Sequence, residues 1–193
     1  MLRWLSPAFL TLTLAFAGGC AEPPNKEMDQ AQGALDAAKA AGAEQYAADE
    51  YRAAADAQKR AHEAVAQSDY RLALNHALDS RERAQNAARQ AANGKAQIRG
   101  EADRTMQEVT GLIVRANARL ETARKARVPR RVVAAPAQEV ATISEEVQKA
   151  REMLAGGNYL EARDMLARLK SRMQKTMDAI EKATAPPASR RRR

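Results

Sequence analysis

The stretch that decides the fold is residues 49–92, which read DEYRAAADAQKRAHEAVAQSDYRLALNHALDSRERAQNAARQAA. Apolar or small residues recur in it at steps of three and four, the spacing that places them on one face of an α-helix. The pattern is interrupted by Gln67-Ser68-Asp69, a sequence typical of a tight turn with Ser68 or Asp69 capping the second helix. The stretch therefore predicts an antiparallel helical hairpin, with the stripe Tyr51, Ala54, Gln58, Ala61, Val65, then Tyr70, Ala73, Ala77, Ser80, Ala84, Ala88 and Ala91.

A second hairpin with the same phase is predicted at residues 138–181, with every stripe position displaced by 89 residues. Its stripe is Val140, Ile143, Val147, Ala150, Leu154, then the turn Gly156-Gly157-Asn158, then Tyr159, Ala162, Leu166, Leu169, Met173, Met177 and Ile180. We therefore expect a tandem repeat. Because each buried Leu or Met contributes about 1.5–3 kcal/mol and Ala contributes far less, we expect the C-terminal hairpin to be the more stable one.

The apolar stripe of the first hairpin continues in phase far beyond Ala91, to Ala123. It passes Asn93-Gly94, Gly100 and Gly111 without a change of register, although each glycine costs about 1 kcal/mol in a helix. The pattern favours one continuous helix from Asp69 to about Ala126, and a kink near Gly94 is the alternative. The predicted fold class is all-α, with elongated antiparallel hairpins sharing one long central helix, by analogy with successive units of a spectrin-type array.

Breaks in the pattern divide the chain. A signal segment at 1–19 is followed by a tether at 20–25, the N-terminal Ala-rich hairpin with its long helix at 26–127, and a linker with two prolines and a basic cluster at 128–136. The C-terminal hairpin is expected at 137–183. Residues 184–193 have no apolar stripe and are expected to form a disordered basic tail.

The N-terminus is typical of an export signal. Arg3 precedes a short apolar run from Trp4 to Ala17, which is too short for a membrane span. The residues Ala17-Gly18-Gly19-Cys20 resemble the bacterial lipoprotein signal, which implies that Cys20 is diacylated and becomes the new N-terminus. Ala21 after the cysteine implies the outer membrane by the sorting rule of that family. The alternative is ordinary secretory cleavage near Ala17, which leaves Cys20, the single cysteine of the chain, as a free thiol.

Composition favours helix over a thick core, because 45 of the 193 residues are alanine and only 4% are aromatic. The formal net charge is +8, and Arg190, Arg191, Arg192 and Arg193 supply half of it. In an exported protein the available polyanions are lipid headgroups, lipopolysaccharide and acidic cell-wall polymers, so we expect these arginines to bind an anionic surface and not nucleic acid. A solvated tail that only aids solubility is the alternative.

The sequence contains no catalytic signature: no phosphate-binding glycine loop, no nucleophile elbow and no metalloprotease helix. We expect no enzyme activity and no cofactor. His62 and His76 flank the predicted turn and are the candidate metal ligands, but a defined site needs a third strong ligand, which favours packing on the hairpin. Tyr51, Tyr70 and Tyr159 are interpreted as caps of the alanine seam.

Two resemblances accompany these patterns. Residues 68–74 and 157–163 are similar to the turn and second helix of tetratricopeptide-type repeats, although the offset of 89 exceeds their period. Residues 26–92, through Gly42–Ala47, Glu50-Tyr51 and Asp69-Tyr70, resemble an uncharacterised family of Ala-rich helical bacterial lipoproteins. That resemblance implies a lipid-anchored envelope protein facing the periplasm, with a structural or adaptor role towards envelope proteins, lipopolysaccharide or cell wall. A binding or carrier module for a peptide, lipid or metal is the alternative.

Overall fold

The computed structural model describes residues 22–185. This part of the chain forms six α-helices and no strand, which confirms the predicted all-α fold. In chain order the helices are α1 (Asn25–Ala40), α2 (Ala43–Tyr46), α3 (Ala48–Ala66), α4 (Tyr70–Lys125), α5 (Arg130–Ala155) and α6 (Tyr159–Thr184).

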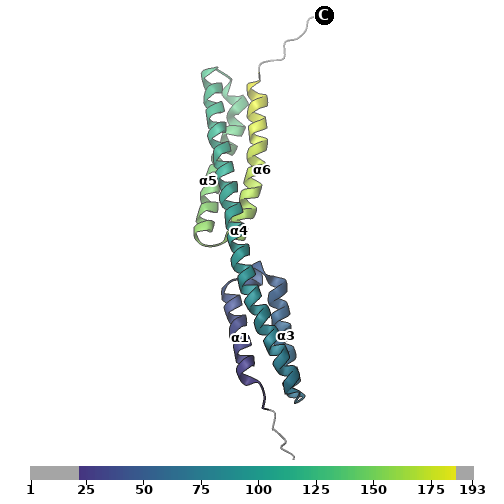
Figure 1. Cartoon of the computed structure of the whole chain (residues 1–193). Coiled ribbons are helices and arrows are strands. Elements are labelled where there is room, and N and C mark those ends of the chain that lie inside the picture. The colour runs from purple at the N-terminus through teal and green to yellow at the C-terminus, as the bar shows by residue number, and fades with distance from the viewer. Residues whose placement is uncertain (1–21, 186–193) are drawn as a thin grey trace, which may run out of the picture.

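The helices make two three-helix bundles joined end to end in a rod (Figure 1). The N-terminal bundle consists of α1, α3 and the first half of α4, with the short α2 packed between them. The C-terminal bundle consists of the second half of α4 with α5 and α6. The predicted hairpins are thus completed by a third helix in each bundle, and α4 belongs to both.

Helix α4 runs without interruption through 56 residues, or about 84 Å at 1.5 Å per residue. The helix does not break at Gly94. A Cβ atom at this residue would lie 3.3 Å from the Tyr46 carbonyl oxygen, so glycine admits the backbone of α2 close to α4. Gly100 and Gly111 have no such neighbour, since nothing lies within 4 Å of the position of their missing Cβ.

The two bundles are separated by a waist, which we define as residues 92–101 of α4. None of these ten residues is buried, whereas Ala91 and Ala102 on either side are fully buried. Tyr159, the first residue of α6, lies beside the waist, with the Lys95 ammonium 5.7 Å and the Arg99 guanidinium 5.9 Å from its ring centre. These cation–π contacts hold the inner end of the C-terminal bundle against α4.

Three interhelix turns share one construction. In each, a residue with positive φ follows the helix: Ser68 (59°), Arg127 (59°) and Gly157 (84°). The next N–H donates to a carbonyl five residues earlier, Asp69 to Ala64 (2.9 Å), Val128 to Ala123 (3.0 Å) and Asn158 to Met153 (2.9 Å). This left-handed ending satisfies carbonyls that the helix leaves free. The Asp69 carboxylate then caps α4 by accepting from Leu72 N–H at 2.9 Å.

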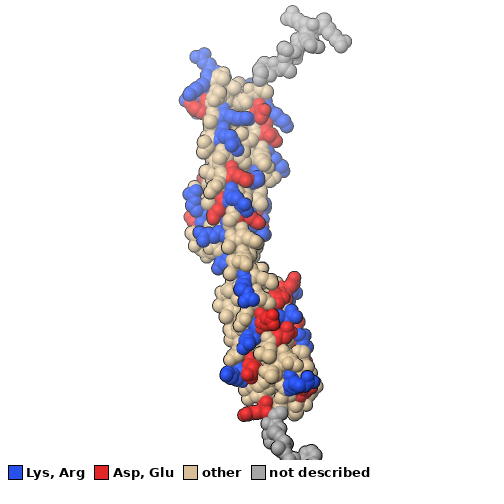
Figure 2. Space-filling view, viewed as in Figure 1, with Lys and Arg blue, Asp and Glu red and all other residues tan. Residues whose placement is uncertain are grey.

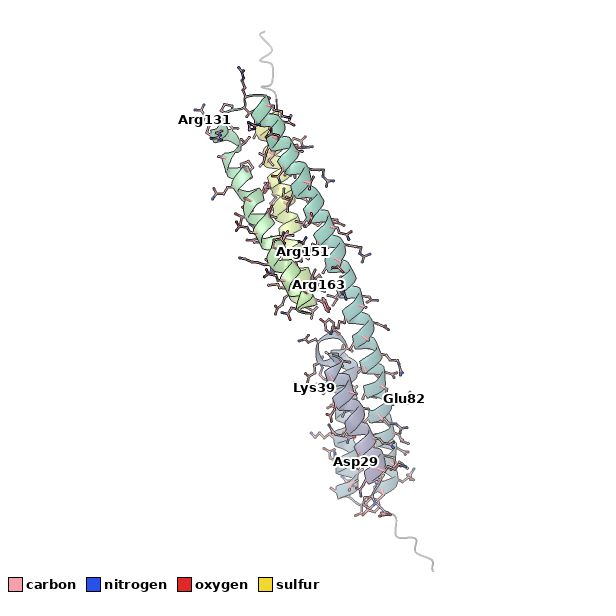
Figure 3. All side chains as sticks on the ribbon, turned by 90° about the vertical axis from the view of Figure 1, so that its left-hand side faces the viewer. Asp29, Lys39, Glu82, Arg131, Arg151 and Arg163 are labelled. Carbon is pink, nitrogen blue, oxygen red and sulfur yellow. The ribbon has the colours of Figure 1, made fainter. Side chains whose placement is uncertain are left out.

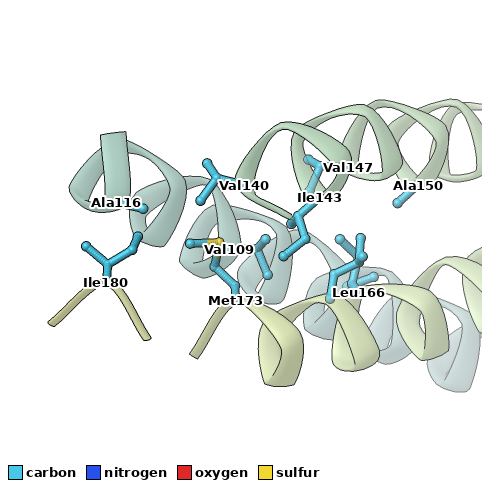
Figure 4. Close-up of a cluster of buried hydrophobic side chains, with 11 residues drawn as sticks. Val109, Ala116, Val140, Ile143, Val147, Ala150, Leu166, Met173 and Ile180 are labelled. Atoms are coloured by element: carbon cyan, nitrogen blue, oxygen red, sulfur yellow. The ribbon is translucent and has the colours of Figure 1, made fainter. Parts of the chain in front are cut away.

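The cores of the two bundles occupy equivalent positions but differ in side-chain size. Six buried residues of α4, namely Ala73, Ala77, Ser80, Ala84, Ala87 and Ala91, each lie 89 positions before a buried residue of α6, namely Ala162, Leu166, Leu169, Met173, Thr176 and Ile180. Ala87 and Thr176 take the buried places predicted for Ala88 and Met177, which are only partly buried. Figure 4 shows the aliphatic core of the C-terminal bundle. The tandem repeat itself stays a prediction.

The linker predicted at 128–136 was too long, because α5 begins at Arg130 and includes Pro136. The proline ring removes only the bond to the carbonyl of Val132, near the start of the helix. Val132 is 43% exposed, so this part of α5 lies at the surface of the bundle. The connection is therefore a short turn, and α6 likewise extends to Thr184, one residue into the predicted tail.

Candidate functional site

The outer end of the C-terminal bundle carries a cluster of cations around the turn between α4 and α5. We call it the basic end and define it as Lys125, Arg127, Arg130 and Arg131. All four are exposed, and Arg131 is seen at this end in Figure 3. Within the described residues, none of the four has a carboxylate at salt-bridge distance. Their charge is therefore available to a partner.

Arg127 occupies the left-handed position of this turn, where Gly157 stands in the turn between α5 and α6. A side chain there costs of order 1 kcal/mol more than glycine. The fold thus tolerates backbone strain at the point where the turn presents a guanidinium to solvent. The sequence pattern predicts a linker with basic residues here, but it does not predict that these residues form a binding site.

Several other cations of the C-terminal bundle differ from the basic end because they are paired with carboxylates. Arg172 contacts Glu139 at 2.9 Å and also contacts Glu146, and the hydrogen bond to Glu139 contributes most to raising its pKa. Arg119 pairs with Glu181 across α4 and α6 at 3.0 Å. The exposed pair of Arg119 and Glu181 contributes little to stability, but all these pairs neutralise the sides of the bundle locally.

The charges of the chain are unevenly distributed along the rod. Residues 22–94 contain nine Lys and Arg against twelve Asp and Glu, whereas residues 95–185 contain eighteen Lys and Arg against twelve Asp and Glu. Lysines and arginines project from the end where α4 meets α5, on the face shown in Figure 2. The rod is therefore net acidic over its N-terminal bundle and net basic over its C-terminal bundle.

Helix α6 ends beside the basic end. Thr184 and Ala185 line a shallow cavity together with Ala126 and Val128 of the α4–α5 turn. The predicted surface-binding residues Arg190, Arg191, Arg192 and Arg193 lie outside the described residues, but they begin six positions after Thr184 in the sequence. The chain therefore leaves α6 next to the four cations of the basic end.

The opposite end of the rod holds the start of α1. Met28 packs with Ala61 and Ala77 near the turn between α3 and α4, far from the basic end (Figure 1). Cys20, the predicted lipidation site, lies outside the described residues, five positions before α1 begins at Asn25. The described residues nearest in sequence to the two predicted attachment points thus lie at opposite ends of the rod.

A groove lies beside the basic end, between the last turns of α4 and the first turns of α5. Its volume is about 470 Å³, and its lining is mainly apolar, with Asn117, Leu120, Glu121, Arg124, Val128, Arg130, Val133, Ala134 and Ala137. Arg124 donates two hydrogen bonds to Glu121, at 2.7 and 2.8 Å, and these hold the pKa of the Glu121 carboxyl below its ordinary value. The stripe pattern gave no sign of this groove, because its apolar residues are only partly covered by the bundle.

His62 and His76, the candidate metal ligands, belong to no group of three potential ligands within the described residues. His62 is exposed on α3 and His76 is half-buried on α4. Both histidines adjoin the buried seam residues Ala61 and Ala77. Tyr159 contacts the cations of the waist, so its ring lies at the boundary between the bundles, and its predicted role as a cap of the alanine seam stays a prediction.

Among the described helices, none combines the length and the apolar character of a membrane span. Comparisons of the chain with known protein families, with curated proteins and with solved structures found no match.

Proposed function

We propose that this chain is a lipid-anchored protein of the bacterial cell envelope, with a structural or adaptor role and no catalysis. Its N-terminus is attached to the outer membrane through Cys20, and its basic end contacts an anionic surface or polymer within the periplasm. The observation that supports the proposal is the placement, at the end of the rod opposite the start of α1, of four cations that have no salt bridge within residues 22–185.

The length of the rod supports a role that bridges two surfaces. Helix α4 alone spans about 84 Å, roughly ten times the Debye length of about 8 Å at physiological salt. The anchoring membrane therefore exerts no appreciable force on the basic end of an upright rod. Lying flat on an anionic membrane would place the net acidic N-terminal bundle against like charge, which favours the upright arrangement.

The magnitude of the expected contact follows from the number of cations. Each Lys or Arg near an anionic surface contributes about 1 kcal/mol. The basic end with Arg190 to Arg193 therefore supplies a contact of several kcal/mol, which adds to the lipid anchor by holding both ends of one rigid body. A nucleic-acid partner does not fit this location.

Binding to vesicles tests the surface contact. The unlipidated chain from residue 21 onward is mixed with vesicles of phosphatidylglycerol and phosphatidylcholine, and with phosphatidylcholine alone, at low and physiological salt. Reversal of Arg127, Arg130 and Arg131 to Glu is expected to weaken binding to the anionic vesicles by at least about a hundredfold, since about 3 kcal/mol is lost. Deletion of residues 189–193 separates the contribution of the tail.

The matched control reverses three exposed and unpaired cations on the sides of the same bundle, Arg104, Arg115 and Arg168. It changes the net charge equally but leaves the basic end intact. Equal loss in both triple variants would reject a defined contact.

The lipid anchor is tested separately. Cys20→Ala should lower the mature mass by the mass of the lipid and release the protein from membranes, and an unchanged mass would reject lipidation.

A further inference from the structure

We propose that the groove beside the basic end binds the aliphatic chain of an anionic amphiphile, whose headgroup lies against Arg130. This inference rests on the proposed function, because it names a ligand class for the same end of the rod. The headgroup chemistry is a phosphate or carboxylate, whether it belongs to a membrane lipid or to a free amphiphile.

The lining of the groove fits an aliphatic chain. Leu120, Val128 and Val133 are only half-buried, and together with Ala134 and Ala137 they leave apolar surface open between α4 and α5. Leu120 also packs against the buried core of the bundle, so the groove floor is continuous with rigid structure. The volume of about 470 Å³ lies within the usual range for small-molecule sites, about 300–1,000 Å³, which suits one chain better than a helix.

The charge at the rim selects the headgroup. Arg124 is held by Glu121 through two hydrogen bonds, whereas Arg130 makes no salt bridge within residues 22–185. Arg127 and Arg131 add positive charge from the neighbouring turn. A guanidinium binds phosphate or carboxylate oxygens through paired N–H donors. An anionic headgroup is therefore favoured over a neutral one, and a cationic one is repelled.

The residues that follow α6 in the sequence supply no suitable occupant. Residues 186–193 contain four arginines, two prolines and no aliphatic side chain larger than alanine. Their charge has the same sign as Arg130, and nothing in them could fill an apolar groove. The C-terminal residues are therefore excluded as the occupant, and the charge of the rim favours a ligand with negative charge.

The probe is dodecyl phosphate below its micelle concentration, added to the unlipidated chain from residue 21 onward and followed by calorimetry and by methyl NMR shifts. Inorganic phosphate and dodecyl maltoside serve as headgroup-only and uncharged-chain controls. We expect saturable 1:1 binding of dodecyl phosphate, with shifts concentrated at Leu120, Val128 and Val133. Equal shifts at the exposed Leu72, Leu78 and Val114 would mean non-specific adsorption and would overturn the inference.

Two variants localise the site. Ala134→Trp fills the groove and is expected to weaken dodecyl phosphate binding by at least about tenfold, whereas Ala118→Trp, an exposed alanine of α4 outside the groove, leaves it unchanged. Arg130→Gln should weaken dodecyl phosphate by about tenfold without affecting dodecyl maltoside. Unchanged binding in Ala134→Trp, or tighter binding of a Glu- and Leu-rich helical peptide than of dodecyl phosphate, would overturn the inference.

Vesicle binding keeps the two proposals separable. If the wild-type chain binds anionic vesicles but not dodecyl phosphate, the groove inference fails and the proposed surface contact stands. If dodecyl phosphate binds in the groove but the triple reversal of the basic end leaves vesicle binding unchanged, the surface contact fails and the groove remains a binding site. Circular dichroism of each variant checks that the helices are retained.

Discussion

The two bundles of this rod have the same construction but fill their interiors differently. Both pair a descending helix with an ascending one through the same left-handed turn, and their buried positions on α4 and α6 are displaced by a constant 89 residues. The N-terminal interior is mostly alanine, with Leu35 and Met28 as its large side chains. The C-terminal interior contains isoleucine, leucine, valine and methionine.

The difference teaches how a helical bundle compensates for small side chains. Ser80 Oγ donates to the Ala54 carbonyl of α3 at 2.9 Å, and Gln58 Nε2 donates to the Met28 carbonyl of α1 at 3.0 Å. Alanine allows the backbones to approach closely enough for these bonds. The equivalent C-terminal positions are Leu169, Ile143 and Val147, which gain stability from apolar burial instead. One bundle is held by close contact and hydrogen bonds, the other by hydrophobic area.

The largest expected effect comes from emptying the aliphatic core. Leu166 is fully buried, so Leu166→Ala should lower the free energy of unfolding of the C-terminal bundle by about 3 kcal/mol. Native-state hydrogen exchange shows which bundle has lost stability in the variant. In the wild type, the amides of α5 and α6 should exchange more slowly than those of α1 and α3. Faster exchange in α5 and α6 than in α3 would contradict the comparison.

The second test places a large side chain in the alanine seam. Ala77 is the counterpart of Leu166 and is fully buried, so Ala77→Leu should destabilise the N-terminal bundle by about 2 kcal/mol through overpacking. Ala55→Leu, at an exposed position of α3, is the control and should change stability by less than about 0.5 kcal/mol. Stabilisation by Ala77→Leu would show that the seam is loosely packed.

The third test removes a polar group from the seam. Gln58 is 5% exposed and its Oε1 has no hydrogen-bond partner in the structure. Gln58→Leu should raise the stability of the N-terminal bundle by about 1 kcal/mol, because the cost of the unsatisfied oxygen exceeds the gain from the bond to Met28. Gln90→Leu, on the exposed side of α4, provides the control for thermal melts. A loss of stability would mean that the hydrogen bond outweighs the orphaned oxygen.

The smallest effect concerns the glycines of α4. Gly100→Ala should raise the thermal midpoint, since it gains about 0.5–1 kcal/mol of helix propensity and meets nothing within 4 Å. Gly94→Ala should gain less than half as much, because its Cβ would lie 3.3 Å from the Tyr46 carbonyl oxygen. Equal gains at the two positions would mean that α2 yields without cost.

Sequence pattern predicted the elements that depend on periodicity and turn chemistry. The continuous helix was predictable because the stripe kept its phase past three glycines, and the turn at Asp69 because of its capping residue. The length of the linker was not predictable, because Pro136 is tolerated inside α5, near the start of the helix. A stripe also shows that a face is buried without naming its partner, so the packing of α1 against α4 required the structure.

The candidate site was predictable only in part. Basic residues of the α4–α5 turn were visible in the sequence, and counting charges in each half would have indicated the polarity of the rod. Whether a cation is paired depends on which carboxylates the neighbouring helix places within reach. Glu181 of α6 pairs with Arg119 in this way, and the sequence pattern does not show which cations find such a partner. The groove depends on how far α5 covers Leu120 and Asn117, a matter of helix placement that periodicity does not encode.

The waist fixes the angle between the two bundles about the rod axis. Because none of its residues is buried, one residue inserted within 92–101 would rotate the groove and basic end by about 100° and advance them by about 1.5 Å. The insertion would change the contacts of Tyr159 with Lys95 and Arg99 but would leave the buried residues of both cores in place. Seven inserted residues would restore the facing to within about 20° and lengthen the rod by about 10 Å. Reach and facing can therefore be changed independently, so an insertion series would measure whether the partner surface requires a particular distance, a particular orientation, or both.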